Sequence, residues 1–311
     1  MSVPDKNGQF DDVILGYDSV DSIQTQPGHP GEPVGRNANR IGGAKFTLNG
    51  VTYELAKNSA EVNNLHSGPD YYRDRIWDAE VEETALGTTI TFGLHSPDGD
   101  QGYPGNADIT VSYTLTPDNC LKLDYHMVSD ADTIANFTNH VYFNLGGYKS
   151  GSALDQKVWI DADYFTATDA NSIPTGELVA VKGTPMDFTE MKPIGRDIQE
   201  DYQALKYGNG YDHNWALNHP AGELSLSAKA EDEKTGRTME VYTDLPGVQF
   251  YTANSLKTEH GKNHAVYTPR CGYCFETQYF PDAINKPEFA SPVIKAGEEY
   301  KTTTIYKFGV K

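Results

Sequence analysis

The chain has 311 residues and carries 25 basic and 44 acidic side chains, which gives a formal net charge of −19. A surface this acidic repels phosphate backbones and anionic lipids, so we expect neither nucleic-acid binding nor membrane binding, whereas neutral ligands do not feel this field. Cys120, Cys271 and Cys274 are an odd and sparse set, which argues against a disulfide framework and favours a reducing compartment. No apolar run approaches the ~18 residues of a membrane span, and residues 1–12 lack the basic start and apolar core of a secretory signal. We therefore expect a soluble cytoplasmic protein.

Apolar and polar residues alternate along several short segments, which is the pattern of strands with one buried face. The alternation covers residues 90–94, 109–115 and 121–127, and the chain ends on another β-rich run at 302–310. Two further runs flank a polar turn within 224–241, so this segment is predicted to form a hairpin. Many short strands separated by Gly, Asn, Asp and Pro indicate an all-β fold, a large sandwich of antiparallel sheets with few short helices.

Little interrupts this pattern of strands. The best helical signal is the short polar stretch 194–206. Two long stretches rich in Gly and Pro, 27–37 and 96–106, are expected to be functional loops, because long loops in compact domains often are. The sequence contains no internal repeat, low-complexity tract or domain boundary, so residues 1–311 are predicted to form a single domain.

Segment 136–147, which reads NFTNHVYFNLGG, carries a first candidate for chemistry. If this segment is a strand, His140, Tyr142 and Asn144 share one face and the intervening apolar residues share the other. One face would then belong to the core, and the opposite face would suit the wall of a carbohydrate site. The pattern alone favours a histidine that is merely hydrogen-bonded on a sheet surface.

Segment 270–285, which reads RCGYCFETQYFPDAIN, carries a second candidate. Its alternation places Cys274, Glu276 and Gln278 on one face and Tyr273 and Phe275 on the other. A carboxylate flanked by bulky residues is partly desolvated, which raises its pKa and makes it a better base. An ordinary solvated glutamate is the simpler interpretation of the pattern alone.

Three polar segments could supply further binding groups. Asp212 lies among aromatic residues in GYDHNWAL, where a carboxylate can bind two hydroxyls while a ring stacks, although a turn explains this segment equally well. Arg40 in GRNANRI could clamp hydroxyls with its fork of donors, and His66 in NNLHSG could make one hydrogen bond. No metal signature, GxGxxG, P-loop or GxSxG motif occurs, and the lone C-x-x-C of Cys271 and Cys274 lacks a second pair.

Taken in order, these segments resemble the galactose mutarotase (aldose 1-epimerase) family. The matching motifs are VPDKNGQFDDVILGYDS, GRNANRI, NNLHSG, SPDGDQGYPG, NHVYFNLGG, YDHNW, PGVQFYTAN, FETQYFPDAINKPEF and KAGEEYKTTTIYKF. They cover nearly the whole chain, and several of them are long and stand in the order that the family has. The resemblance implies the galactose mutarotase-like supersandwich, with a sugar cleft across one sheet.

The resemblance also implies roles for individual residues. His140 would be the general acid and Glu276 the general base for interconversion of the α and β anomers of free aldoses such as galactose and glucose. The sugar hydroxyls would be bound by Arg40, Asn39, His66, Asp212 and Gln249. Ring opening and reclosure need a base for the anomeric hydroxyl and an acid for the ring oxygen, but no cofactor and no metal. A neutral pH optimum would follow if Glu276 is ionised while His140 is protonated.

Two departures from the family pattern are visible. The chain begins where the family is already under way, so the domain is expected to lack the first N-terminal strands and to leave a sheet edge unpaired. The histidine loop reads LHSG where the family commonly has two glycines. Ser67 restricts the backbone more than glycine would, which makes the placement of His66 less certain.

Three alternatives stay open on the sequence. A hexose 6-phosphate 1-epimerase would need a basic cluster at the cleft, of which the acidic composition gives no sign. A non-catalytic sugar-binding or regulatory relative would need neither Glu276 nor His140. A lectin-like or polysaccharide-lyase sandwich would normally be secreted. We expect a monosaccharide as the only small-molecule partner, and a monomer or homodimer.

Overall fold

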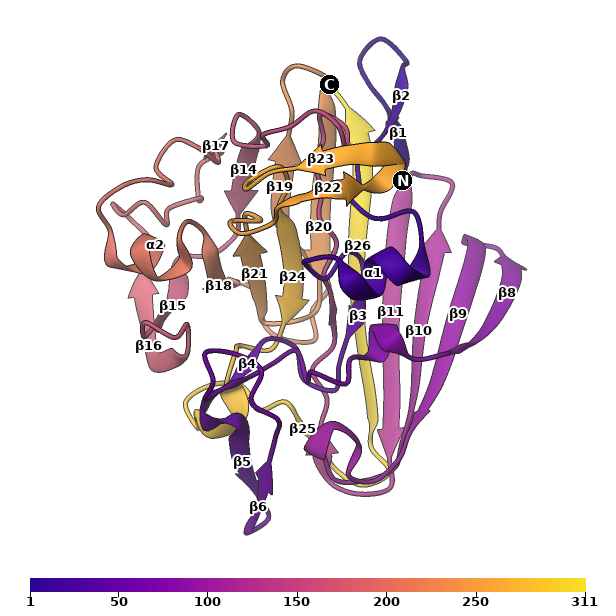
Figure 1. Ribbon diagram of the computed structural model, residues 1–311, viewed down its shortest axis with the longest axis vertical. Helices are drawn as coiled ribbons and strands as arrows, with labels where there is room; N and C mark the ends of the chain where they lie inside the picture. The colour runs from indigo at the N-terminus through magenta and orange to yellow at the C-terminus, as the bar shows by residue number, and fades with distance from the viewer.

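Two antiparallel sheets, packed face to face, make up the body of the molecule in the computed structural model, which describes residues 1–311 (Figure 1). The nine-stranded sheet has the order β17 (Lys192–Pro193), β14 (Lys157–Ile160), β19 (Ser225–Glu231), β20 (Arg237–Thr243), β26 (Glu299–Val310), β11 (Cys120–Ser129), β10 (Ala107–Leu115), β9 (Gly87–Ser96) and β8 (Asp78–Thr84). The five-stranded sheet has the order β16 (Pro174–Ala180), β15 (Tyr164–Thr168), β18 (Asp212–Ala216), β21 (Gly247–Tyr251) and β24 (Cys274–Gln278). The predicted β-sandwich is therefore confirmed.

Short two-stranded ribbons and two short helices complete the chain. The ribbons pair β1 (Ser2–Pro4) with β2 (Phe10–Asp12), β3 (Pro33–Val34) with β13 (Thr138–Asn139), β4 (Arg40–Ile41) with β7 (Asn64–Leu65), β5 (Lys45–Leu48) with β6 (Val51–Glu54), β12 (Thr133–Ile134) with β25 (Val293–Ile294), and β22 (Thr258–Gly261) with β23 (Ala265–Tyr267). The α-helices are α1 (Val20–Thr25) and α2 (Gln203–Gly208), and 3₁₀ turns lie at Gly42–Ala44, Tyr72–Asp74, Asp100–Gly102, Lys262–His264 and Ala283–Asn285. No helix is long and apolar enough to span a membrane.

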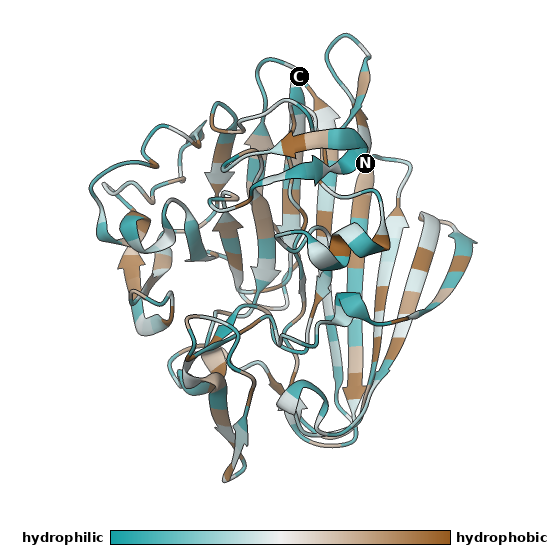
Figure 2. Cartoon of the chain, in the orientation of Figure 1, coloured by the Kyte–Doolittle hydropathy of each residue, from teal (hydrophilic) through white to brown (hydrophobic).

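The predicted alternating runs lie in the nine-stranded sheet, within β9, β10, β11 and β26. The hairpin predicted within residues 224–241 is formed by β19 and β20, which pair antiparallel from Ser225 opposite Thr243 to Glu231 opposite Thr238. Figure 2 shows the alternation as brown and teal bands along these strands. The period of two that was read from the sequence therefore reflects one buried and one more exposed face.

The core lies between the inner faces of the two sheets. Phe275 of β24 and Tyr273, which directly precedes this strand, are buried in it together with Tyr306 of β26. The Tyr306 hydroxyl donates a hydrogen bond to the Phe275 carbonyl over 3.0 Å, and the hydroxyls of Thr277 and Thr304 meet at 2.6 Å. Because these residues occupy the inner face of β24, the alternate residues of the same strand point to the opposite side of the five-stranded sheet.

The helix predicted at 194–206 is largely wrong. Only Gln203–Gly208 is helical, and the residues before it form turns. Ile194 and Ile198 both lie in the core, which explains the helix-like spacing of four. The backbone N–H groups of Ile194 and Gly195 instead donate to carbonyls of residues 156 and 154, so a pairing outside the segment replaces the helical bonds.

Candidate active site

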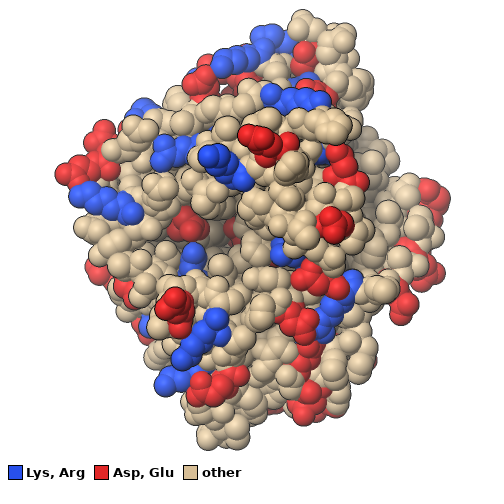
Figure 3. Space-filling view, in the orientation of Figure 1, with Lys and Arg blue, Asp and Glu red and all other residues tan.

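A cavity of about 430 Å³ opens on the outer side of the five-stranded sheet. Its volume lies within the range of small-molecule sites. Figure 3 shows a hollow in this face, with acidic and basic atoms beside it. Six of the seven residues predicted as site residues line this cavity: Asn39, Arg40, His66, His140, Asp212 and Glu276. The fold therefore brings together groups that are up to 237 positions apart in the chain, the separation of Asn39 from Glu276.

Glu276 occupies the middle of β24 on the face that points away from the core. Its neighbours on this face are Cys274 and Gln278, as the alternation predicts, and all three are buried. Register opposite Gln249 of β21 holds the strand in place. Oε2 of Glu276 is buried without any hydrogen-bond partner in the protein. A buried carboxylate oxygen left unpaired is costly, so its position is suited to a ligand that supplies a donor.

His140 reaches Glu276 from a segment that runs along the free side of β24. Asn136 and Phe143 tie this segment to the strand end and to Tyr273, through hydrogen bonds on either side of His140. Only Thr138–Asn139 is a strand, so the predicted alternation holds in part. His140 and Tyr142 line the cavity, whereas Asn144 binds the carbonyls of residues 151 and 271 and supports the loop.

Two imidazole rings face the Glu276 carboxylate. Nε2 of His140 lies 3.7 Å from Oε1, and Nε2 of His66 lies 4.0 Å from Oε2. Nδ1 of His66 accepts a hydrogen bond from the backbone N–H of Asn39 over 3.1 Å. The neutral His66 ring therefore carries its proton on Nε2, the atom nearest to Glu276.

The other ring nitrogen of His140, Nδ1, faces Cys274. This nitrogen lies 3.4 Å from Sγ of Cys274. Burial raises the pKa of the Cys274 thiol well above its usual value, and the nearby Glu276 charge adds to the rise. The thiol thus keeps its proton. The contact fits both neutral tautomers of His140, because the thiol donates when Nδ1 has the lone pair and Sγ accepts when Nδ1 carries the proton.

The position of the His66 proton decides whether the cluster of His66, His140 and Glu276 is suited to bind a metal or a substrate. The ligating atoms of His66, His140 and Glu276 lie within 4.8 Å of one another, a spacing that could hold a metal ion. A metal ligand needs a lone pair on Nε2 and usually donates its other N–H to an acceptor. Because Nδ1 of His66 accepts from the Asn39 N–H, Nε2 of the neutral ring carries a proton and has no lone pair for a metal. The cluster therefore suits hydrogen bonding to a substrate better than metal binding.

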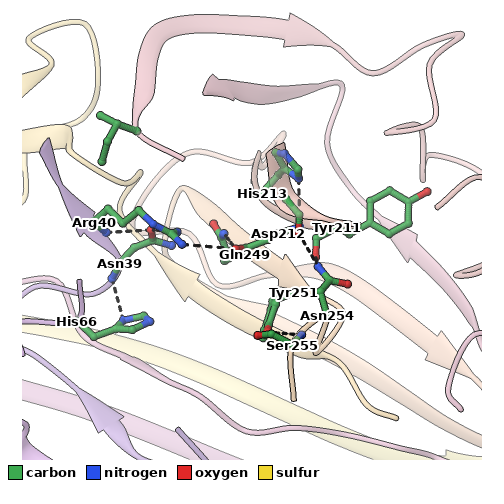
Figure 4. Close-up of polar contacts among 12 residues, drawn as sticks. Asn39, Arg40, His66, Tyr211, Asp212, His213, Gln249, Tyr251, Asn254 and Ser255 are labelled. Atoms are coloured by element: carbon green, nitrogen blue, oxygen red, sulfur yellow. Dashed lines mark hydrogen bonds and ion pairs between the residues drawn. The ribbon is translucent and has the colours of Figure 1, made fainter. Parts of the chain in front are cut away.

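Arg40 and Asp212 form a second polar group in the cavity wall (Figure 4). Nη2 of Arg40 lies 3.6 Å from Oδ2 of Asp212, and Nη1 of Arg40 donates to Oδ1 of Asn39. Asn39 in turn donates through Nδ2 to Gln278 beside the base strand. Arg40 Nε is buried without a partner, so the guanidinium keeps a free donor.

Gln249 is the predicted site residue that does not line the cavity. Its Nε2 donates to Oδ1 of Asp212 over 2.7 Å, and its Oε1 accepts from Gln278. The structure therefore places Gln249 behind Asp212, where it fixes the orientation of the carboxylate (Figure 4).

Ser67 adopts a left-handed backbone conformation although it is not a glycine. His66 and Ser67 both have positive φ, 53° and 58°, a region where glycine is favoured. The Ser67 hydroxyl accepts from the Asn37 N–H and is in contact with the Asn37 carbonyl and the Tyr103 hydroxyl, each over 3.0 Å. These contacts compensate for the strain, and His66 still reaches the cavity.

Burial shifts the two predicted proton-transfer groups in opposite directions. It raises the pKa of Glu276 well above its ordinary value, and the Asp212 charge adds to the rise while Arg40 opposes it. It lowers the pKa of His140 to about 3, and His29 adds to the fall. The rise for Glu276 has the direction expected of a desolvated carboxylate, whereas burial disfavours a protonated His140.

Several lining residues escaped the sequence-based selection. His29 and Gly28 come from the Gly- and Pro-rich loop 27–37, whose expected functional role was assigned to no residue in particular. Tyr251, at the end of β21, and Ser255, in the loop that follows, also line the cavity. The second loop, 96–106, instead holds the buried Arg36 through carbonyls of residues 96, 97 and 104. The Gly and Pro content of the sequence indicated two functional loops, but it could not show which of them borders the cavity.

Comparison with known proteins matches this architecture. The family model described as aldose 1-epimerase matches residues 1–307. Galactose mutarotase from Bos taurus is 41% identical over 312 residues, covering 100% of this chain and 87% of the relative, and aldose 1-epimerase from Escherichia coli K12 is 34% identical over 308 residues, covering 98% and 87%.

Solved structures agree with the sequence relatives. The GalM/aldose epimerase homologue from C. elegans superposes with a TM-score of 0.89 at 26% identity, covering 99% of this chain and 91% of that one. Galactose 1-epimerase from Lactobacillus acidophilus NCFM superposes with a TM-score of 0.84 at 26% identity, covering 99% and 88%. The chain therefore belongs to the aldose 1-epimerase family.

Proposed function

We propose that this protein is an aldose 1-epimerase that interconverts the α and β anomers of free aldoses such as galactose and glucose. The observation that carries the proposal is the buried Glu276 carboxylate, whose two oxygens lie 3.7 and 4.0 Å from Nε2 of His140 and His66. A base and an acid at this separation can act on two neighbouring oxygens of one sugar ring. Family membership supports the same reaction class.

Glu276 acts as the base and His140 as the acid in this mechanism. The reactive form pairs an ionised Glu276 with a protonated His140. Glu276 takes the proton of the anomeric hydroxyl, the His140 imidazolium gives its Nε2 proton to the ring oxygen, and the C1–O5 bond breaks to give the open aldehyde. Rotation about C1–C2 presents the other carbonyl face. Reclosure returns the proton from Glu276 to O1 and the ring proton to His140, so the enzyme is unchanged.

The opposite pKa shifts favour both proton transfers. A carboxylate with a raised pKa is a stronger base, and an imidazolium with a lowered pKa is a stronger acid. When Glu276 accepts a proton and His140 gives one away, two buried charges disappear together. The reactive ionic form is therefore costly in the cavity, and its discharge into the sugar is favourable.

The remaining polar residues bind the sugar in this proposal. Arg40, Asn39 and Asp212 present donors and acceptors to hydroxyls, and His66 presents Nε2–H beside Glu276. Gln249 acts on the sugar through Asp212, to which it donates a hydrogen bond. The Tyr142 and Tyr251 rings in the cavity wall offer apolar surface to the carbon skeleton.

A hexose phosphate fits the cavity less well. Its wall contains one guanidinium, that of Arg40, and two carboxylates, those of Asp212 and Glu276. A phosphate dianion would meet repulsion from both carboxylates and would have only one fixed cation as a partner. A neutral aldose meets neither difficulty.

Polarimetry tests the proposal directly. Freshly dissolved α-galactose and α-glucose are followed with and without protein, and the expected result is faster approach to the equilibrium rotation. Absence of acceleration for any aldose, together with sugar binding in calorimetry, would favour the non-catalytic sugar-binding alternative.

Variants test the two roles separately. Glu276→Gln and His140→Asn are each expected to lower kcat by at least about 100-fold, because each removes one proton-transfer partner. The exposed residues Glu83 and His95 provide the matched controls Glu83→Gln and His95→Asn, which are expected to keep wild-type rates. Near-normal turnover in a folded Glu276→Gln or His140→Asn protein would contradict the assignment.

A further inference from the structure

A third histidine borders the cavity beside the proposed acid. The ring centroid of His29 lies 5.4 Å from that of His66 and 5.5 Å from that of His140. His29 lines the cavity, and its loop is bonded to the backbone of the acid itself. The His140 N–H donates to the Glu32 carbonyl over 3.1 Å, and the Gly31 N–H donates to the His140 carbonyl over 2.9 Å. The loop therefore keeps His29 at a fixed distance from the proposed proton-transfer groups.

A buried ion pair fixes the His29 ring. Nδ1 of His29 lies 2.6 Å from Oε1 of Glu32, whose other oxygen lies 3.2 Å from Nε of Arg73. Arg73 donates through Nη1 to the Gly28 carbonyl over 3.0 Å and stacks over the Tyr71 ring. Glu32 is only 5% exposed, so a buried carboxylate holds the His29 imidazole at Nδ1.

This arrangement sets the tautomer of His29. A contact of 2.6 Å between an imidazole nitrogen and a carboxylate oxygen requires a proton between them, so Nδ1 carries it. Arg73 Nη1 is also 3.3 Å from Nδ1, but this contact is longer than the 2.6 Å contact of Nδ1 with Glu32, and Nη1 donates to the Gly28 carbonyl over 3.0 Å. In its neutral form the ring therefore has its lone pair on Nε2, and no protein group is hydrogen-bonded to that atom.

His29 thus differs from the two histidines next to it. His66 in its neutral form carries Nε2–H and can only donate, because the Asn39 N–H occupies its Nδ1. His140 acts through Nε2 as the proposed acid. His29 offers the opposite capacity, an acceptor on Nε2 backed by a carboxylate on Nδ1. A sugar hydroxyl needs partners of both kinds, since it donates one hydrogen bond and accepts others.

We propose that His29 is a further sugar-binding residue that accepts a hydrogen bond from one hydroxyl of the aldose through Nε2. Glu32 and Arg73 are positioning residues that hold the ring and its tautomer. The inference deepens the proposed function and rests on it, because it names a contact that would distinguish aldoses differing at one hydroxyl. A site that holds an acceptor for a hydroxyl discriminates against sugars that lack that hydroxyl.

The first experiment compares wild type with His29→Phe and His29→Gln by polarimetry on α-galactose. His29→Phe removes the acceptor but keeps a planar ring, and it is expected to lower kcat/KM by about 3- to 10-fold, mainly through KM. His29→Gln places an amide oxygen near the position of Nε2 and is expected to restore most of this loss. The exposed His95 supplies the control variant His95→Phe, which should leave KM unchanged. Wild-type KM in His29→Phe would overturn the proposal.

A panel of deoxygalactoses sharpens the test. The wild-type to His29→Phe ratio of kcat/KM is expected to return to about 1 for the one deoxy sugar that lacks the contacted hydroxyl, and to persist for the others. An equal loss for every deoxy sugar would show that His29 acts on the fold or on His140 and not on a hydroxyl. That result would contradict the proposal even if His29→Phe is less active.

Binding measurements separate this inference from the proposed reaction. If the wild type accelerates no mutarotation, galactose affinity by calorimetry still compares wild type, His29→Phe and His29→Gln, and equal affinities would refute the contact. The nitrogen chemical shifts of His29 report the tautomer directly. Wild type is expected to show the Nδ1–H tautomer of His29 alone, whereas Glu32→Gln is expected to show a mixture of tautomers. In polarimetry, Glu32→Gln is expected to have a raised KM and a kcat near that of wild type. A pure Nε2–H tautomer in wild type would overturn the assignment of Glu32.

Discussion

At the scale of single residues, the burial of Glu276 makes it a stronger base but lowers the stability of the fold. Its carboxyl is 2% exposed, one of its oxygens has no protein donor, and burial raises its pKa well above the ordinary value. A group whose folded-state pKa is raised stabilises the fold below its unfolded pKa. That contribution is lost as pH rises through the folded pKa, because the charged form is then buried. The proposed base therefore costs stability at the pH where it has to be ionised.

Glu276→Gln is accordingly expected to stabilise the protein while it abolishes turnover. The gain should be on the order of 1 kcal/mol at pH 8 and should shrink towards pH 5, since the wild-type carboxyl is then protonated and resembles the amide. Urea unfolding at both pH values measures it. A carboxylic C=O stretch that persists in wild type above pH 5 and is missing in Glu276→Gln would confirm the raised pKa. A variant less stable than wild type at pH 8 would contradict this account.

At the scale of elements, β24 divides its residues between core and site. The inner face packs against β26, and the outer face carries Cys274, Glu276 and Gln278. The alternation of this strand was predictable because a side-chain period of two requires no knowledge of the partner strands. The segment of His140 was predictable only in part. It lies beside β24 but is held by irregular hydrogen bonds to the loop of Gly31 and Glu32, which no local pattern encodes.

The hairpin of β8 and β9 offers a test at the same scale. Gly87 has φ of 127°, and a Cβ there would meet the Leu115 carbonyl oxygen at 2.1 Å. Gly87→Ala is therefore expected to cost about 1–3 kcal/mol through backbone strain and overpacking. Gly93 lies in the same strand, and a Cβ there would have no atom within 4 Å, so Gly93→Ala is the matched control and should be nearly neutral.

Neither glycine borders the cavity, so both variants should keep the wild-type kcat/KM in polarimetry while urea unfolding separates them. Equal stability of Gly87→Ala and Gly93→Ala would show that the hairpin relaxes without cost. A loss of activity in Gly87→Ala at temperatures where it is folded would show an unexpected coupling of this sheet edge to the cavity.

At the scale of the whole molecule, buried histidines make stability depend on pH. Burial lowers the pKa of His140 to about 3 and that of His213 to about 4, and it also lowers the pKa of His66 well below 6.5. A histidine with a lowered folded-state pKa contributes stability above its unfolded pKa of 6.5. That stability is lost as pH falls towards the folded value, since the unfolded chain binds more protons.

The free energy of unfolding is therefore expected to fall between pH 7 and pH 5 by about 2 kcal/mol for each of these histidines. The raised pKa of Glu276 opposes this trend and offsets part of it. His213→Asn keeps an acceptor for the Asp212 N–H and should remove the contribution of one histidine from the slope. Urea midpoints across this pH range measure the effect. Identical slopes in wild type and His213→Asn would refute it.

Both sheets contribute to one core, and the cavity takes its groups from β4, β18, β24 and the loops around β3, β7 and β13. We infer from this shared core that residues 1–311 act as a single domain. The two Gly- and Pro-rich loops, both expected to be functional, lie in different places. The loop 27–37 borders the cavity, whereas the loop 96–106 binds Arg36 behind it.

The sequence by itself determined the β-sandwich, the strands β9, β10, β11 and β26, the face that Glu276 shares with Cys274 and Gln278 and, through ordered motifs, the family. These features depend on a local period of two or on residues adjacent in the chain. Only the tertiary structure decided which side chains meet. Three arrangements join distant segments: the contact of Glu276 with His140 and His66, the ion pair of Glu32 with Arg73, and the hydrogen bond of Gln249 to Asp212. Such contacts arise from the packing of distant elements, and one sequence read alone contains no distance between them.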